Sequence, residues 1–160
     1  MPTPRPSRDH IDELDLLEAG RRLGPANVRP PQVKLGKLAD GGVAPAIMAI
    51  VERGVRRRPA LARTPQAEVE LAMDERYPPV RIVFGERMVL VEDGPAVAPD
   101  LRVRGALPDL VSLMVAPLLG GVPSPINARG RAALGMVALG RVRIEGRLGM
   151  MRRMLSLIRI

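Results

Sequence analysis

The sequence has 160 residues, which suits one domain with an appendage; 46% of them are apolar, 1% are aromatic, and the formal net charge is +8. It contains no cysteine and a single histidine, His10. This composition excludes disulfides, thiolate catalysis, cysteine-based zinc sites and any relay between histidines. Because Tyr77 and Phe84 are the only aromatic residues, any cavity must have mainly aliphatic walls. Such walls suit an apolar ligand and would bind a nucleobase poorly, because bases stack on aromatic rings.

The first 41 residues form a distinct arm in composition. Residues 1–8 are rich in proline and arginine without an apolar run, so we do not expect a secretory signal. The spacing of Ile11, Leu14 and Leu17 predicts a helix over 9–23, and the prolines and glycines of 25–42 predict a linker. We therefore divide the chain into an arm, 1–41, and a domain, 42–160.

The first half of the domain begins with a helix and continues as strands. An apolar stripe predicts a helix over 42–58, where the run Arg56 to Arg58 complements the helix dipole. Residues 69–73, 80–84 and 88–91 are expected strands, with a tight turn at Gly85-Glu86 between the last two. The alternation over 101–105 predicts a fourth strand with one buried and one solvated face.

The second half returns to helical spacing. We expect helices over 107–118 and 131–139, a Gly/Pro/Ser loop over 120–130 between them, a fifth strand over 141–146 and a last helix over 148–160. This order indicates an α+β fold with a five-stranded mixed or antiparallel sheet covered by helices. The last helix is apolar almost all round, so it is either buried from two sides or faces something apolar.

Two stretches and a helix between them resemble one family. They are Pro99-Asp100-Leu101-Arg102-Val103-Arg104-Gly105, the helix Pro108-Asp109-Leu110-Val111-Ser112-Leu113-Met114, and Leu139-Gly140-Arg141-Val142-Arg143-Ile144-Glu145-Gly146-Arg147-Leu148. In this order they resemble the sterol carrier protein type-2 family of lipid-binding domains. The resemblance implies an apolar tunnel between sheet and helices, holding a sterol, fatty acyl chain, phospholipid or isoprenoid and quinone intermediate. It implies no cofactor and no catalytic residue.

The chain departs from that family in three ways. Residues 119–127 form a longer segment than the family pattern has, Phe84 is the only aromatic residue in the early strands, and the arm has no counterpart. These departures concern the identity of the ligand more than the fold.

The inward face of the strands and the two long helices supply the expected lipid-binding residues. They are Ile82, Phe84, Val89, Leu101, Val103, Leu110, Met114, Leu118, Val142, Ile144, Met150, Met151, Met154, Leu155 and Ile158. Methionine side chains adapt to irregular ligands. Arg152 and Arg153 beside these methionines are expected to contact an anionic membrane, near a mouth formed with the 120–130 loop. Any folded domain would also need apolar residues at these positions, and the arginines could simply solvate the helix.

Three other functions are weighed against lipid binding. The apolar last helix and the arm could instead serve oligomerisation or docking on a partner protein, so a homodimer stays open. Positive charge alone suggests nucleic acid, but no aromatic interleaving accompanies it, and we expect no nucleic-acid partner. The acids lie near expected turns without a partner base, so we expect no enzyme.

Without an apolar run of about 18 residues, the chain is expected in the cytoplasm, with peripheral contact with an inner membrane left open.

Overall fold

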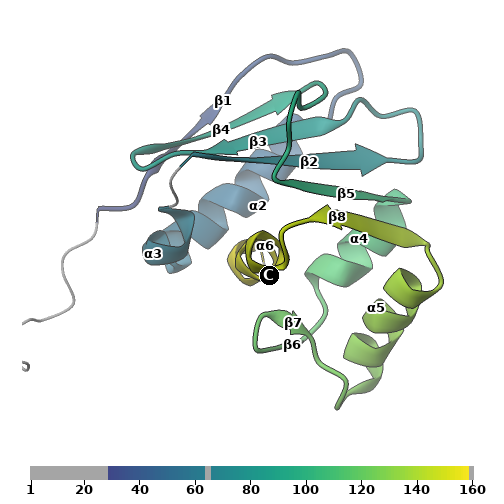
Figure 1. The fold of residues 1–160 in the computed structure, drawn as a ribbon. Helices are drawn as coiled ribbons and strands as arrows, with labels where there is room; N and C mark the ends of the chain where they lie inside the picture. Colours follow the sequence, from purple (N-terminus) through teal and green to yellow (C-terminus); the bar gives the residue numbers. More distant parts are fainter. Residues whose placement is uncertain (1–28, 64–65, 159–160) are drawn as a thin grey trace, which may run out of the picture.

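The computed structural model describes residues 29–63 and 66–158, so the helix predicted over 9–23 lies outside the described residues. A six-stranded mixed sheet forms one layer, in the order β1-β4-β3-β2-β5-β8 (Figure 1). Its strands are β1 (Gln32–Leu35), β2 (Ala67–Met73), β3 (Val80–Phe84), β4 (Met88–Asp93), β5 (Leu101–Gly105) and β8 (Val142–Gly146). Neighbouring strands are antiparallel except β1 with β4 and β2 with β5, which are parallel.

The sixth strand, β1, corrects the expected count of five. It lies within the stretch that the sequence predicts as a linker, and it pairs with β4 from Gln32 opposite Met88 to Leu35 opposite Val91. Its residues Gln32, Val33, Lys34 and Leu35 alternate between polar and apolar, but three of the four are exposed, and this short run stands among the prolines and glycines that indicate a linker. The sheet therefore extends into the segment assigned to the arm by composition.

Helices cover one face of this sheet, as expected for an α+β fold (Figure 1). They are α2 (Ala44–Arg57), α3 (Pro59–Ala62), α4 (Leu107–Met114), α5 (Ala128–Ala138) and α6 (Leu148–Ile158). The helix predicted over 107–118 ends at Met114, and a small hairpin of β6 (Leu118–Leu119) with β7 (Val122–Pro123) spans the predicted end of that helix and the start of the predicted loop. Gly120 and Gly121 both have positive φ there, +61° and +81°, which a two-residue turn of this kind requires.

Polar side chains decide where several helices begin. Asp93, at the end of β4, accepts hydrogen bonds from the backbone N–H groups of Ala39 (3.1 Å) and Ala44 (3.0 Å), and so holds the start of α2 against the sheet. Asn127 caps α5 by accepting a hydrogen bond from the Gly130 N–H at 2.7 Å. Because of this cap, α5 begins at Ala128, three residues before the predicted start.

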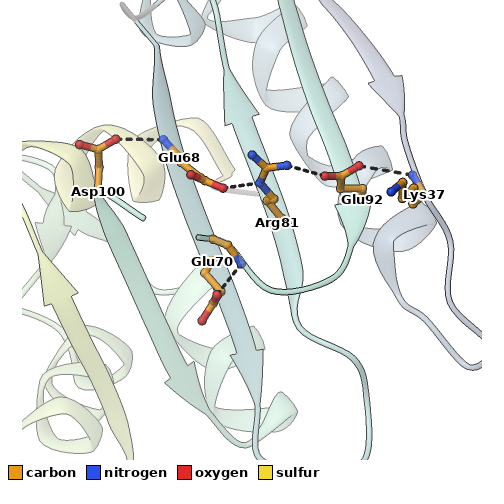
Figure 2. Close-up of polar contacts among 7 residues, drawn as sticks. Lys37, Glu68, Glu70, Arg81, Glu92 and Asp100 are labelled. Atoms are coloured by element: carbon orange, nitrogen blue, oxygen red, sulfur yellow. Dashed lines mark hydrogen bonds and ion pairs between the residues drawn. The ribbon is translucent and has the colours of Figure 1, made fainter. Parts of the chain in front are cut away.

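The other face of the sheet carries a network of ion pairs. Arg81 of β3 donates to Glu68 of β2 on one side and to Glu92 of β4 at 2.7 Å on the other (Figure 2). Hydrogen bonding to Glu68, and then to Glu92, raises the pKa of the Arg81 guanidinium above its ordinary value, so this group stays charged at any pH used in practice. The network extends to Asp100, which accepts from the Glu68 N–H at 3.0 Å.

The connection from β4 to β5 crosses this face because β3 and β2 lie between the two strands. Glu70, which is buried, accepts from the Ala96 N–H of this connection at 2.7 Å and pairs with Arg102 at 2.6 Å (Figure 2 shows the bond to the connection). The charges on this face of the sheet are thus paired, and the β4–β5 connection covers part of it. The apolar side chains of the strands lie on the other face, against the helices.

We expect Arg81→Met to lower the free energy of unfolding by about 1–3 kcal/mol, because two nearly buried carboxylates lose their donor. Urea denaturation measures the change. Arg104→Met is the matched control: its pair with Asp74 is exposed on both sides, so its loss should cost at most about 1 kcal/mol. Equal losses in the two variants would contradict a structural role for the network.

Candidate lipid pocket

An apolar pocket lies between the helical face of the sheet and helices α4 and α6. All fourteen lining side chains are apolar, and they come from six elements. These are Ile47 of α2, Leu71 and Met73 of β2, Leu101 and Val103 of β5, Leu107, Leu110, Leu113 and Met114 of α4, Ile144 of β8, and Met151, Met154, Leu155 and Ile158 of α6. Such a lining offers a ligand dispersion contacts and burial of apolar surface, with no side chain that hydrogen-bonds.

The pocket is nearly closed. Its volume is about 30 Å³, whereas pockets that hold drug-sized ligands run to about 300–1,000 Å³. The tunnel implied by the resemblance is therefore a small internal cavity here, because methionine and leucine side chains from α4 and α6 fill the space. A lipid would have to displace these side chains or move a helix.

Nine of the expected lipid-binding residues line this pocket: Leu101, Val103, Leu110, Met114, Ile144, Met151, Met154, Leu155 and Ile158. The other six do not. Ile82, Phe84, Val89 and Val142 are buried in the core away from the pocket, and Leu118 and Met150 are half-buried outside its lining. β4 contacts α2 and β3 lies beside β4, so the inward residues of these two strands belong to a part of the core away from β5 and the pocket.

Sequence reasoning missed five lining residues: Ile47, Leu71, Met73, Leu107 and Leu113. Leu71 and Met73 share the inward face of β2 with Val69, so the alternation of that strand already marks them as buried. What the sequence lacks is the neighbour relation: β2 lies beside β5, which brings Leu71 opposite Val103 and places both under α4 and α6.

Two polar contacts hold α4 in place over the pocket. Glu75 accepts from the Leu107 N–H at 2.9 Å and 3.0 Å, at the first residue of the helix. Asp109 is buried and accepts two hydrogen bonds from Arg141, at 3.0 Å and 2.5 Å, which join the first turn of α4 to the start of β8. Asp109 belongs to the motif that carries the family resemblance, and here its role is structural.

Helix α6 is held more firmly at its C-terminal half than at its start. Met154, Leu155, Leu157 and Ile158 are buried, whereas Leu148 is 57% exposed and Met150 and Met151 are half-buried. Arg58 donates to the Ser156 carbonyl at 2.7 Å, and Gly54 of α2 lies directly against the Leu157 backbone. Of the α6 residues that line the pocket, Met151 therefore lies in the partly exposed half of the helix, and Met154, Leu155 and Ile158 lie in the buried half.

Of the two arginines expected to contact a membrane, Arg152 is exposed and Arg153 is half-buried. Arg152 lies beside the β6–β7 hairpin, because a Cβ placed on Gly121 would come 3.1 Å from the Arg152 Cβ. The predicted neighbourhood of α6 and the 120–130 loop is therefore present. Within the described residues, no three His, Cys, Asp or Glu side chains gather as a metal site would require, and no helix has the length and apolar character to cross a membrane.

Searches with the sequence find no matching protein-family model and no matching curated protein. Solved structures do match. The UbiJ-SCP2 ubiquinone synthesis protein aligns with a TM-score of 0.53 at 17% identity, over 72% of this chain and 92% of that chain. The palmitated SCP2L2 of Aedes aegypti aligns at 0.44 and 14% identity, over 71% and 91% of the two chains. A stereoselective inverting sec-alkylsulfatase from a Pseudomonas species aligns at 0.45 and 12% identity, over 61% of this chain and 14% of that chain.

The first of these alignments spans nearly the whole of the solved chain. The likeness concerns the backbone fold, since few residues are identical. The resemblance first noted around Asp100 and Gly146 is confirmed at that level. The chain has the fold of the sterol carrier protein type-2 domains.

Proposed function

We propose that this chain binds an apolar lipid without catalysing a reaction on it, and that the ligand occupies the pocket between the sheet, α4 and α6. The observation that carries the proposal is the pocket lining itself, in which every side chain is apolar. The fold supports it, because the solved structure that it matches at a TM-score of 0.53 is a sterol carrier protein type-2 domain described as a ubiquinone synthesis protein. The ligand class we propose is a fatty acyl, sterol, phospholipid or isoprenoid and quinone intermediate.

Binding must widen the pocket, since about 30 Å³ holds no acyl chain. Each methylene buried contributes about 0.8 kcal/mol, so a chain of ten or so methylenes offsets a moderate opening cost and the cost of association. The exposed start of α6 and its flexible methionines are the parts that can yield with the least loss of packing. We therefore expect the ligand to enter beside Met151 and Met154.

Met151→Trp is expected to weaken binding of a fluorescent fatty acid by at least about tenfold, because the larger ring takes the space of two or more methylenes of the ligand. Met150→Trp is the matched control: it is the neighbouring residue on α6 and also half-buried, but it does not line the pocket. Its affinity should stay near that of the unchanged chain. Fluorescence titration of both variants, each shown to be folded by circular dichroism, measures the difference.

Equal affinities for Met150→Trp and Met151→Trp would place the ligand elsewhere. A folded chain that takes up no fatty acyl, sterol or isoprenoid compound would refute lipid binding altogether.

We also propose that α6 touches an anionic membrane through Arg152 and Arg153, beside the half-buried methionines. A basic residue near such a surface contributes about 1 kcal/mol to binding. Arg152→Glu should therefore lower the bound fraction on vesicles with about 30% phosphatidylglycerol by severalfold. Arg53→Glu, an equal charge change at an exposed position of α2, is the control. Co-sedimentation that falls equally in both variants would indicate attraction by net charge alone.

The alternative, an assembly module, stays a prediction. Its expected surfaces are the apolar last helix and the arm, and most of the arm lies outside the described residues. The C-terminal half of α6 is buried inside its own chain, which leaves less of that helix for a partner. Light scattering after removal of lipid tests it: a homodimer would double the measured mass, and a monomer at all concentrations would remove this alternative.

A further inference from the structure

A basic groove lies where the residues before β1, β1 itself, α2 and the β3–β4 turn meet. Its volume is about 900 Å³, and its walls include Arg29, Arg56, Arg63 and Arg87, with Glu52 and Glu86 as the acidic residues among its lining. Arg57 and Arg58 continue the positive charge past Arg56 at the end of α2. Four of the arginines therefore converge from four separate segments of the chain.

The arginines of this groove are poorly neutralised by the described residues. Arg56 pairs with Glu52 at 3.1 Å, but both side chains are largely exposed, at 70% and 44%. Arg63 donates to the Arg29 carbonyl at 3.0 Å. A backbone carbonyl is neutral, so this hydrogen bond does not compensate the charge of the Arg63 guanidinium. This contrasts with the open face of the sheet, where Arg81 and Arg102 each have carboxylate partners. A groove with surplus positive charge favours an acidic occupant.

The chain itself supplies such an occupant at the right place. Residues 9–18 contain five acids, Asp9, Asp12, Glu13, Asp15 and Glu18, and no lysine or arginine. The described chain starts inside the groove, since residues 29–33 form part of its lining and the Arg29 carbonyl accepts a hydrogen bond from Arg63, the residue after α3. Ten residues separate Glu18 from Arg29. Such a connection reaches at most roughly 35 Å, which keeps the acidic segment at a millimolar effective concentration near the groove.

We propose that the acidic segment 9–18 docks in the basic groove of the same chain. Its carboxylates pair there with Arg56, Arg63 and Arg87, and the apolar residues Ile11, Leu14 and Leu17 lie among the acids. The docking surface is distinct from the lipid pocket, because no residue lines both. Docking of this segment therefore does not depend on lipid binding.

Hydrogen exchange of the full-length chain, read by mass spectrometry over residues 9–18, tests the docking. At about 20 mM salt we expect exchange on the order of tenfold slower than at about 500 mM, because exposed ion pairs contribute a factor of roughly 1.4 to 5 each and salt screens them. Arg56→Glu with Arg87→Glu should abolish the protection. Adding Asp12→Arg and Asp15→Arg to that variant should restore it, because the pairs then re-form with their charges exchanged.

The control is Arg129→Glu with Arg143→Glu, which changes the net charge equally at exposed positions outside the groove and should leave the protection intact. Exchange that is equally fast at both salt concentrations would overturn the proposal. Equal loss of protection in the control would also overturn it, since net charge alone would then be responsible. Protection that falls on dilution at constant salt would assign the segment to the groove of another copy and refute docking within one chain.

Discussion

Gly54→Ala is expected to lower the free energy of unfolding by roughly 2–3 kcal/mol, even though alanine is the better helix former. A Cβ at Gly54 would lie 2.0 Å from the Leu157 carbonyl oxygen and 2.8 Å from its carbonyl carbon. The obstacle is backbone, so no side-chain rotation relieves it. The helices α2 and α6 would have to separate, and with them the buried end of the helix that covers the lipid pocket. Urea denaturation measures the loss.

Gly135→Ala is the matched control for this substitution. Gly135 also lies inside a helix, α5, but a Cβ there meets no atom within 4 Å. The same change should be neutral or stabilising by up to about 1 kcal/mol. If Gly54→Ala proved as well tolerated as Gly135→Ala, the close crossing of α2 and α6 would be wrong, and with it the position of α6 over the pocket.

A second pair of variants on α6 separates packing from ligand binding. Leu155 and Leu157 are both buried, at 5% and 1% exposed, but only Leu155 lines the pocket. We expect Leu155→Ala and Leu157→Ala each to lower the free energy of unfolding by about 2–5 kcal/mol, because each leaves a cavity in the core. Without ligand, the melting temperatures of the two variants should therefore fall by similar amounts.

Their response to ligand should differ. Leu155→Ala enlarges the pocket from its volume of about 30 Å³, which removes part of the opening cost and strengthens the binding of decanoate. Because a ligand stabilises the folded state according to its affinity, excess decanoate should raise the melting temperature of Leu155→Ala more than that of Leu157→Ala. Equal shifts would mean that the ligand does not occupy the space beside Leu155.

The periodicity of the sequence predicts most of the fold because the residues that form one apolar face of a helix or strand are close together in the sequence. The strand Val80–Phe84 is found at its predicted bounds, since Val80, Ile82 and Phe84 alternate with half-buried residues. The helix α2 is also close to its predicted range, because its buried residues Ile47, Val51 and Val55 repeat at helical spacing. These signals need no knowledge of which elements are neighbours.

The errors arise where structure depends on partners distant in sequence. β1 forms because its backbone pairs with β4, and the short alternation of its four mostly exposed residues after Pro30-Pro31 does not identify that partner. Phe84 is buried as predicted, but β2 separates its strand from β5, and Phe84 does not line the pocket. Leu71 and Met73 reach the pocket only because β2 adjoins β5. Alternation reveals the face of a strand, whereas the position of that strand in the sheet is set by tertiary contacts.

Native mass spectrometry of the purified chain, followed by organic extraction and identification of what it releases, tests the central claim most directly. We predict a stoichiometric lipid, with a mass and chemistry that identify it as a fatty acyl, sterol, phospholipid or isoprenoid compound. Such a ligand would also show that the pocket widens from its closed volume. A folded chain that carries no lipid, and takes none up when fatty acyl and isoprenoid compounds are added, would contradict the account: the side chains of α4 and α6 would then simply fill a solid core.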